Sequence, residues 1–321
     1  MTGDTMQIGT LEYTADTAGR SIVDAYVEQL AQLRDEGFTR MWCSQKPSER
    51  DLLTVLAVAL REVGGIEVGA GVLPIQNQHP MLLAQRVLTL NLIAGGRFTL
   101  GLGMSDRWVT ETMWGIPWDR PIRRLGEYLD GLLPLLAGQQ ADAAGETVTT
   151  RGLVQIPGAR GPQVYIGALG PKMLQLAGRR AAGTMTWLTG PKAIAEHVIP
   201  ALRRAACEAG RSDGAVRVVA ALPVSVTDDV CAARKLAGEL FAVYGDIPSY
   251  RAMLDLEGLE GPVDAALIGD EQEVSRRLEE MRAAGVDEFV AETFDPSAEG
   301  RARTRALLRE FDIAGTALRA S

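Results

Sequence analysis

The residues best suited to chemistry in this sequence form a glycine-rich turn over 165–173, which reads Tyr-Ile-Gly-Ala-Leu-Gly-Pro-Lys-Met. The pattern predicts a strand that runs through a glycine turn directly into a helix whose first turn holds Pro171 and Lys172. The free backbone amides and the dipole at such a helix start favour an anion, and the lysine adds a full positive charge. Phosphate is therefore the ligand that this turn suits best.

The next loop along the chain, Thr186-Trp-Leu-Thr-Gly-Pro191, has the same design one strand later. Because neighbouring parallel strands end side by side, the two loops could share one phosphate or a pyrophosphate. The alternative is ordinary turn chemistry, since Gly-Pro is common at helix starts whatever the function. The residues alone leave both interpretations open.

Two further glycine clusters end predicted strands. In the run Gly95-Gly-Arg-Phe-Thr-Leu-Gly-Leu-Gly103, a dinucleotide fingerprint would need one more glycine where Asp106 stands, so a Rossmann site is not predicted. Glycines at a strand end instead allow a flat cofactor ring to approach the backbone. Gly69-Ala-Gly71-Val72 has the same character.

Several enzyme classes lack the residues they need. The few lysines lie outside the predicted strands, which disfavours a Schiff-base aldolase. The 2 histidines are too few for a hydrolytic metal centre, and no metal site is predicted. We interpret His79, beside Pro80, as a helix cap, and His197 as a surface residue. No Gly-x-Ser-x-Gly nucleophile elbow occurs.

Polar side chains at other strand ends are the remaining candidates for catalysis. Ser44 and Gln45 follow a predicted strand, where they can donate and accept hydrogen bonds but cannot supply a strong base. Cys43 beside them is interpreted as a small buried residue rather than a nucleophile. Three acids also stand near strand ends, and a structural or solvated role is the simpler interpretation for each: Glu12, Asp106 and Glu292.

A repeating unit of strand and helix must position these groups. Apolar runs bounded by turn signals predict strands buried on both faces, and the helical segments between them imply parallel pairing. Eight such pairs predict a (β/α)8 TIM barrel with insertions at its C-terminal face, where the site would lie on the loops after the strands. The predicted strands are Met6–Thr10, Arg40–Ser44, Glu67–Val72, Phe98–Leu102, Val164–Ile166, Thr184–Trp187, Val216–Val226 and Phe289–Thr293.

The segments between the strands include both helices and longer excursions. We expect the stretch from Trp108 to Arg120, which holds three tryptophans, to form part of a pocket wall, and 138–162 to form a surface hairpin. Residues 229–259 are expected to be a lid over the mouth or a dimer element. The main predicted helices are Thr17–Glu36 with Asp16 as its cap, Asp51–Val63, a helix that begins at His79-Pro80, Pro121–Leu136, Ala193–Ala209, a helix that begins at the capping box of Asp270, and Ala298–Phe311.

Composition restricts the partners. The 321 residues are expected to form a single domain, and the net charge of −8 argues against a nucleic-acid or anionic-membrane surface. Small molecules are the expected partners, and a homodimer is left open. The 3 widely spaced cysteines fit a reducing cytoplasm, and neither a signal peptide nor a membrane span is predicted.

At this point the residues resemble a known group, the luciferase-like monooxygenase superfamily, and within it the oxidoreductases that use the deazaflavin coenzyme F420. The resemblance covers nearly the whole chain and rests on the segments 95–103, Gly115-Ile-Pro-Trp-Asp-Arg-Pro121, Ala168–Met173 with Thr186–Pro191, and Tyr244-Gly-Asp-Ile-Pro-Ser-Tyr-Arg-Ala-Met253. It implies a flavin-like ring against the ends of the third and fourth strands, with a non-prolyl cis peptide near Gly71-Val72. It also implies a phosphate tail on the loops after the fifth and sixth strands. The implied cofactor-binding residues are Gly71, Val72, Leu73, Gly103, Met104, Ala168, Leu169, Gly170, Pro171, Lys172, Met173, Trp187, Thr189 and Gly190.

The chain departs from the family pattern where a proton would be handled. Many members carry an acid and a histidine where this chain has Ser44-Gln45, and a histidine where it has Asp106. The hypothesis is hydride transfer between F420 and a small unsaturated or imine-like substrate, with Ser44, Gln45 or Asp106 as the catalytic residues that orient it. The alternatives are an FMN-dependent monooxygenase and a cofactor-binding barrel without turnover.

Overall fold

The predicted strands close into a barrel. The computed structural model describes residues 6–12 and 19–320. Eight parallel strands form a ring in which each is hydrogen-bonded to the next and the last pairs with the first. In ring order they are β1 (Gln7–Glu12), β2 (Arg40–Cys43), β3 (Glu67–Pro74), β4 (Phe98–Gly103), β7 (Val164–Gly167), β8 (Gly183–Trp187), β9 (Arg217–Val226) and β11 (Glu288–Thr293). The (β/α)8 prediction is confirmed.

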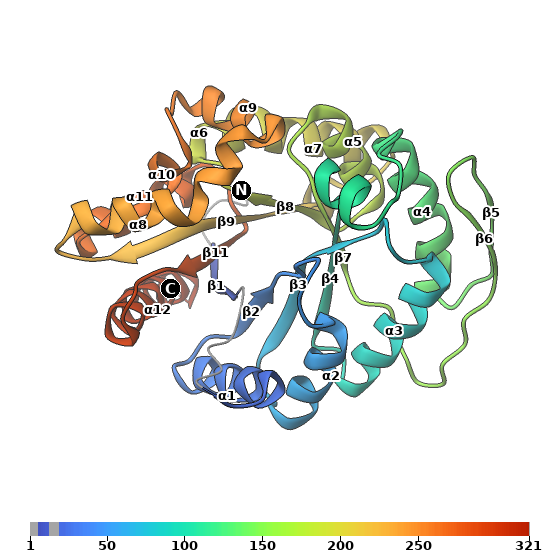
Figure 1. Ribbon diagram of the computed structural model, residues 1–321, viewed down its shortest axis with the longest axis horizontal. Helices are drawn as coiled ribbons and strands as arrows, with labels where there is room; N and C mark the ends of the chain where they lie inside the picture. The colour runs from blue at the N-terminus through green and yellow to red at the C-terminus, as the bar shows by residue number, and fades with distance from the viewer. Residues whose placement is uncertain (1–5, 13–18, 321) are drawn as a thin grey trace.

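Helices surround this ring on the outside (Figure 1). They are α1 (Ile22–Asp35), α2 (Leu52–Glu62), α3 (Pro80–Ile93), α4 (Pro121–Leu136), α5 (Pro171–Arg180), α6 (Pro191–Ala193), α7 (Ile199–Glu208), α11 (Glu271–Ala283) and α12 (Ala298–Ala320). A π-helical turn, Ile194–Val198, joins α6 to α7. Among the described residues, no helix combines the length and apolar character that a membrane crossing requires.

Most predicted boundaries hold to within a few residues, and two features differ. The first helix begins at Ile22, where the Ser21 hydroxyl accepts a hydrogen bond from Val23 N, so the predicted start at Thr17 is wrong. The predicted cap, Asp16, lies outside the described residues. The sequence reading missed β10 (Leu267–Gly269), a strand of 3 residues that pairs with the end of β9 outside the ring.

Two insertions lie on the flanks of the barrel. The expected hairpin is present as β5 (Ala141–Ala144) and β6 (Thr149–Gly152), which project beside α4 (Figure 1). The excursion over 229–259 contains α8 (Val230–Phe241), a 3-10 turn at Ala242–Asp246 and α9 (Pro248–Glu257), and the short α10 (Pro262–Ala265) follows it. In Figure 1 these orange helices lie together near β8 and β9.

The inside of the barrel is a packed apolar plug. Its members project inward from successive strands and are Leu11, Trp42, Tyr165, Met185, Val219, Ala221 and Val290. The Trp42 and Tyr165 rings meet edge to face at 5.9 Å between centroids. A larger cluster fills the layer between strands and helices. Because the plug closes the interior, a ligand must bind at one end of the barrel.

Candidate active site at the barrel mouth

The end of β3 forms an apolar floor at the mouth, the end of the barrel where the strands terminate. The pairing of β3 with β4 shifts register in a bulge, and the Gly71–Val72 peptide bond within it is cis, as the resemblance implied. Val72 reaches across toward β4. A Cβ built on Gly103 would lie 2.5 Å from Val72 Cγ2, and one built on Gly101 would lie 3.1 Å from Val72 Cγ1.

The glycines of β4 therefore have a packing role that the sequence did not reveal. We interpreted them as giving a flat ring access to the backbone, but their immediate effect is to leave room for the Val72 side chain. The five residues expected to contact a ring differ in accessibility: Gly71, Val72 and Met104 are half-buried, and Leu73 and Gly103 are buried. Leu73 belongs to the core and supports the floor from behind.

Trp42 supports this floor from inside the barrel. A Cβ built on Gly71 would lie 3.2 Å from Trp42 Cε3, so the indole lies directly against the bulge. The indole Nε1 donates a 2.6 Å hydrogen bond to Glu288 Oε1, and Arg40 Nε lies 3.5 Å from the same oxygen. Burial raises the pKa of Glu288, although Arg40 and the bond from Trp42 act in the opposite direction. Glu288 thus fixes the ring that holds the floor in place.

The structure distinguishes the two polar residues that follow β2. Ser44 is 9% exposed, and its Oγ is buried with no hydrogen-bond partner among the described residues. Gln45 is engaged throughout: its Nε2 donates to the carbonyls of Lys46 at 2.7 Å and Arg50 at 2.8 Å, and its Oε1 accepts from Leu52 N at 2.8 Å. Gln45 therefore holds the β2–α2 loop, and Ser44 has the hydroxyl that remains available to a ligand.

Asp106 has a structural task that limits its use in catalysis. It is exposed, and its Oδ1 accepts a 2.8 Å hydrogen bond from Val109 N at the start of a helical turn. The neighbouring loop is held by Gln76, a buried residue that our sequence reading missed, whose Oε1 accepts from Ser105 N at 3.2 Å. Because Gln76 follows β3 and Ser105 follows β4, this bond ties together the two loops at the floor.

The start of α5 has the geometry that the glycine turn predicted. Gly170 is the N-cap residue with ordinary extended backbone, Pro171 opens the helix, and no side chain caps this end. A Cβ built on Gly170 meets no atom within 4 Å, so the space before the helix is open. Lys172 and Pro171 are exposed, Gly170 and Met173 are half-buried, and Ala168 and Leu169 are buried behind them. The turn can accept an anion through its backbone and Lys172.

The start of α6 differs, because the protein already supplies an anion there. Glu257 of α9 accepts a 2.5 Å hydrogen bond from Ala193 N, and its carboxylate lies where a Gly190 side chain would be. Partial burial raises the pKa of Glu257, and the bonds from the helix amides oppose that rise. Thr189 and Gly190 are themselves buried. Glu257 thus stands at the helix start where a shared phosphate was expected, and contact of Thr189 and Gly190 with a phosphate stays a prediction.

His197 also has a role that the sequence reading missed. We expected a surface residue, but its ring is partly buried and Nε2 lies 3.0 Å from the Leu169 carbonyl oxygen. The π-helical turn brings the ring to the loop that precedes α5. His197 therefore positions the anion-accepting turn. His79, in contrast, is the helix cap that was predicted, with Nδ1 accepting from Met81 N at 3.2 Å.

Aromatic side chains of the excursion cover the end of β8. Trp187, expected at the cofactor site, is half-buried and meets the rings of Phe241 and Tyr244 edge to face, each at 5.9 Å. Tyr244 in turn meets Tyr250 at 5.2 Å. Met253 of α9 packs with Leu169 and Ala193 beside the loops after β7 and β8. The excursion thus packs against the side of the mouth that carries the anion-accepting turn.

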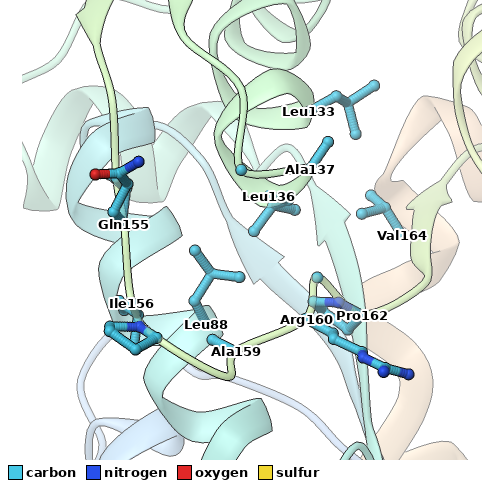
Figure 2. Close-up of a pocket in the computed structure, with 14 residues that line it drawn as sticks. Leu88, Leu133, Leu136, Ala137, Gln155, Ile156, Ala159, Arg160, Pro162 and Val164 are labelled. Carbon is cyan, nitrogen blue, oxygen red and sulfur yellow. The ribbon is translucent and has the colours of Figure 1, made fainter.

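A large cavity elsewhere lacks the groups that chemistry needs. It has a volume of about 870 Å³ and lies where α3 and α4 end and β7 begins, so it is at the opposite end of the barrel from the mouth. Figure 2 shows Leu133 and Leu136 on one side, Gln155 and Ile156 on the other, and Leu88 between them. Arg160 is the one charged residue of its lining. The candidate site therefore remains at the mouth.

Fold and site together define an α/β barrel with an apolar, bulged floor and one open anion turn at the ends of its strands. The chain belongs to the luciferase-like monooxygenase family, whose model matches residues 10–288. The 5,10-methylenetetrahydromethanopterin reductase of Archaeoglobus fulgidus is 30% identical over 302 residues, which cover 83% of this chain and 88% of that relative. The enzyme of the same name from Methanolobus tindarius is 29% identical over 245 residues, 76% of this chain and 73% of that relative.

Solved structures with the same fold cover almost the whole chain. The coenzyme F420 dependent tetrahydromethanopterin reductase from Methanopyrus kandleri superposes with a TM-score of 0.78 at 23% identity, covering 97% of this chain and 99% of that one. An F420-dependent secondary alcohol dehydrogenase, in complex with an F420-acetone adduct, gives a TM-score of 0.80 at 18% identity, with 96% and 99% covered. At these identities the structural likeness concerns the fold.

Proposed function

We propose that this protein is an oxidoreductase that transfers a hydride between coenzyme F420 and a small organic substrate, with reduction of a C=C or C=N bond as the favoured reaction. The observation that carries the proposal is the combination, at one end of the barrel, of the floor at Val72 and the uncapped start of α5. Support also comes from the names of the relatives, which are reductases, and of two structural neighbours, which use F420.

The residues present fit a planar ring with an anionic tail. The floor offers apolar surface at Val72 and Met104, while Gly170 and Lys172 offer an open turn and a positive charge. The buried, unpartnered hydroxyl of Ser44 fits a polar group above the floor. When bound, coenzyme F420 would supply a two-electron hydride carrier.

The chain's own residues would then bind, orient and shield. Lys172 and the backbone at Gly170 hold the anionic tail, and Val72 with its glycine neighbours fixes the plane of the ring. Ser44 donates a hydrogen bond that orients the acceptor group of the substrate, because its loop is held rigid by Gln45. The aromatic side chains of the excursion exclude water from the mouth.

An anaerobic activity assay tests this proposal. Wild-type protein is mixed with reduced F420 and a set of unsaturated and imine acceptors, and oxidation of the coenzyme is followed by absorbance. We expect turnover with at least one acceptor, a loss of about 100-fold or more in kcat for Ser44→Ala, and no change for Ser48→Ala, an exposed serine of the same loop. Oxygen-dependent product from reduced FMN, with none from reduced F420, would replace the proposal with monooxygenation.

A further inference from the structure

A second pocket opens beside the mouth, and two of its polar residues, Arg124 and Tyr128, are not used by the site described above. It has a volume of about 410 Å³ and lies between the β3–α3 loop, the N-terminal half of α4 and the tip of the β5–β6 hairpin. Its apolar lining comes from Ile75, Pro80, Ile116 and Val148. The predicted pocket wall over 108–120 contributes here through Ile116, whereas Trp108 is 64% exposed to solvent.

Two polar side chains of this pocket lack partners. Tyr128 is 1% exposed, and its hydroxyl is buried with no hydrogen-bond partner among the described residues. Burial raises the pKa of Tyr128, so the hydroxyl remains a protonated donor. One turn earlier on α4, the buried Nε of Arg124 also has no partner within the described part of the chain. A buried donor without an acceptor reduces the stability of the folded protein, so each of these two groups requires an explanation.

The charges around Arg124 are already balanced by one another. Arg120 pairs with Asp119 and Glu146, and Arg123 pairs with Glu146, so two cations face two carboxylates. Arg86 pairs with Asp51 and therefore needs no anion from the pocket. Arg124 forms no ion pair with any described residue, so it is the cation of this region whose charge is left for a ligand.

The nearest acid on the same helix is also committed. Glu127 accepts hydrogen bonds from Glu146 N, Thr147 N and Val148 N at 2.7 to 3.1 Å, and from the Thr147 hydroxyl at 2.6 Å. Its own desolvation would raise the pKa, but these bonds prevail and lower the pKa of Glu127 to about 2. The carboxylate is thus ionised and committed to the hairpin tip, and it forms no ion pair with Arg124.

Hydrogen bonds fix the walls of the pocket in place. His79 Nε2 lies 3.0 Å from the Thr149 carbonyl oxygen and joins the β3–α3 loop to the hairpin. Gln76 joins the same loop to the one after β4 through Ser105 N. The pocket is therefore formed before any ligand arrives, as most small-molecule sites are.

We propose that this pocket binds an organic monocarboxylate, with Arg124 pairing with the carboxylate and Tyr128 donating a hydrogen bond to it. A single uncompensated guanidinium matches one negative charge, whereas a phosphate dianion would keep an unpaired charge. The apolar body of the ligand packs on Ile75, Ile116 and Val148. The volume suits a small molecule. This site does not depend on F420, because neither Arg124 nor Tyr128 belongs to the proposed cofactor site.

Calorimetric titration of the full chain with benzoate tests the proposal. We expect saturable binding of benzoate, at least tenfold weaker binding of neutral benzamide, and weaker binding of inorganic phosphate than of benzoate. Arg124→Gln should weaken benzoate binding at least tenfold and Tyr128→Phe severalfold. Arg123→Gln, an exposed cation on the same helix, should leave it unchanged.

Two readouts keep the test independent of folding. Tyr128→Phe removes only an unpartnered hydroxyl, so its thermal stability should equal or exceed that of the wild type. Benzoate should raise the melting temperature of the wild type and not that of Arg124→Gln. Absence of saturable benzoate binding, equal binding by Arg124→Gln, or a preference for benzamide or phosphate would overturn the proposal.

Discussion

We expect Gly103→Ala to destabilise the folded protein, because the added methyl group would collide with Val72. The new Cβ would lie 2.5 Å from Val72 Cγ2 and 3.5 Å from Val72 Cβ. Carbon atoms in contact prefer about 3.5–4.0 Å, so the closer pair overlaps by about 1 Å. Valine cannot easily turn away, because its branched side chain has few rotamers. Overpacking of this kind costs about 1–3 kcal/mol.

Denaturant unfolding of four proteins measures this coupling: the wild type, Gly103→Ala, Val72→Ala and the double variant. Val72→Ala removes the overlapping methyl group, so the double variant should be more stable than the sum of the single changes predicts, by about 1 kcal/mol or more. Coenzyme binding, followed by fluorescence, should weaken in Gly103→Ala because the floor is displaced. If Gly103→Ala unfolded at the wild-type midpoint, or if the two changes were additive, the packing argument would be refuted.

Three other predictions concern α4, the hairpin and the excursion. Gly126→Ala, in open space within α4, should raise the free energy of unfolding by about 0.5–1 kcal/mol, whereas Gly131→Ala, which would meet Thr150 Cβ at 2.6 Å, should lower it. Because the pKa of Glu127 is about 2 in the folded protein, against an ordinary value of 4.5, the unfolded chain binds more protons between these two pH values. Urea titrations should therefore show that Glu127→Gln destabilises most above about pH 5 and less as the pH falls. Glu257→Ala should lower the free energy of unfolding by about 1 kcal/mol, because the start of α6 loses its cap. A urea unfolding midpoint equal to that of the wild type would contradict the capping role.

The periodicity of the sequence was sufficient for the barrel because buried parallel strands are continuous apolar runs. Such runs are visible without any knowledge of their partners. The strand Leu267–Gly269 was missed because 3 residues are too few to carry a period. Local chemistry likewise predicted the caps at His79 and Asp270, whose hydrogen bonds span only two or three residues.

The site was predictable only where its geometry is local. Gly170 and Lys172 could be placed at a helix start from adjacent residues alone. Glu257, in contrast, caps a helix whose bonded amide is 64 residues away in the chain. The difference between Ser44 and Gln45 is also invisible in sequence, because it depends on which side chain turns back to hold the loop. Our sequence reading treated these neighbours as equivalent, and the structure separates them.

The role of Gly103 shows a further limit of sequence reading. A glycine at a strand end indicates that a group approaches the backbone closely, and we expected that group to be a cofactor ring, whereas Val72 lies there in the structure. The identity of the approaching group depends on the bulge in β3, which shifts the register and directs Val72 across β4. No pattern within β4 itself contains that information.

Equilibrium binding of F420 and FMN, each oxidised and reduced, shows which cofactor the barrel mouth accepts. Purified full-length protein is titrated with each cofactor and followed by fluorescence, with Lys172→Gln as the variant and Lys192→Gln as a matched control on the neighbouring helix, whose start already holds Glu257. We expect preferential tight binding of F420, weakened by Lys172→Gln and unaffected by Lys192→Gln. Preference for FMN, or binding of neither cofactor, would contradict it.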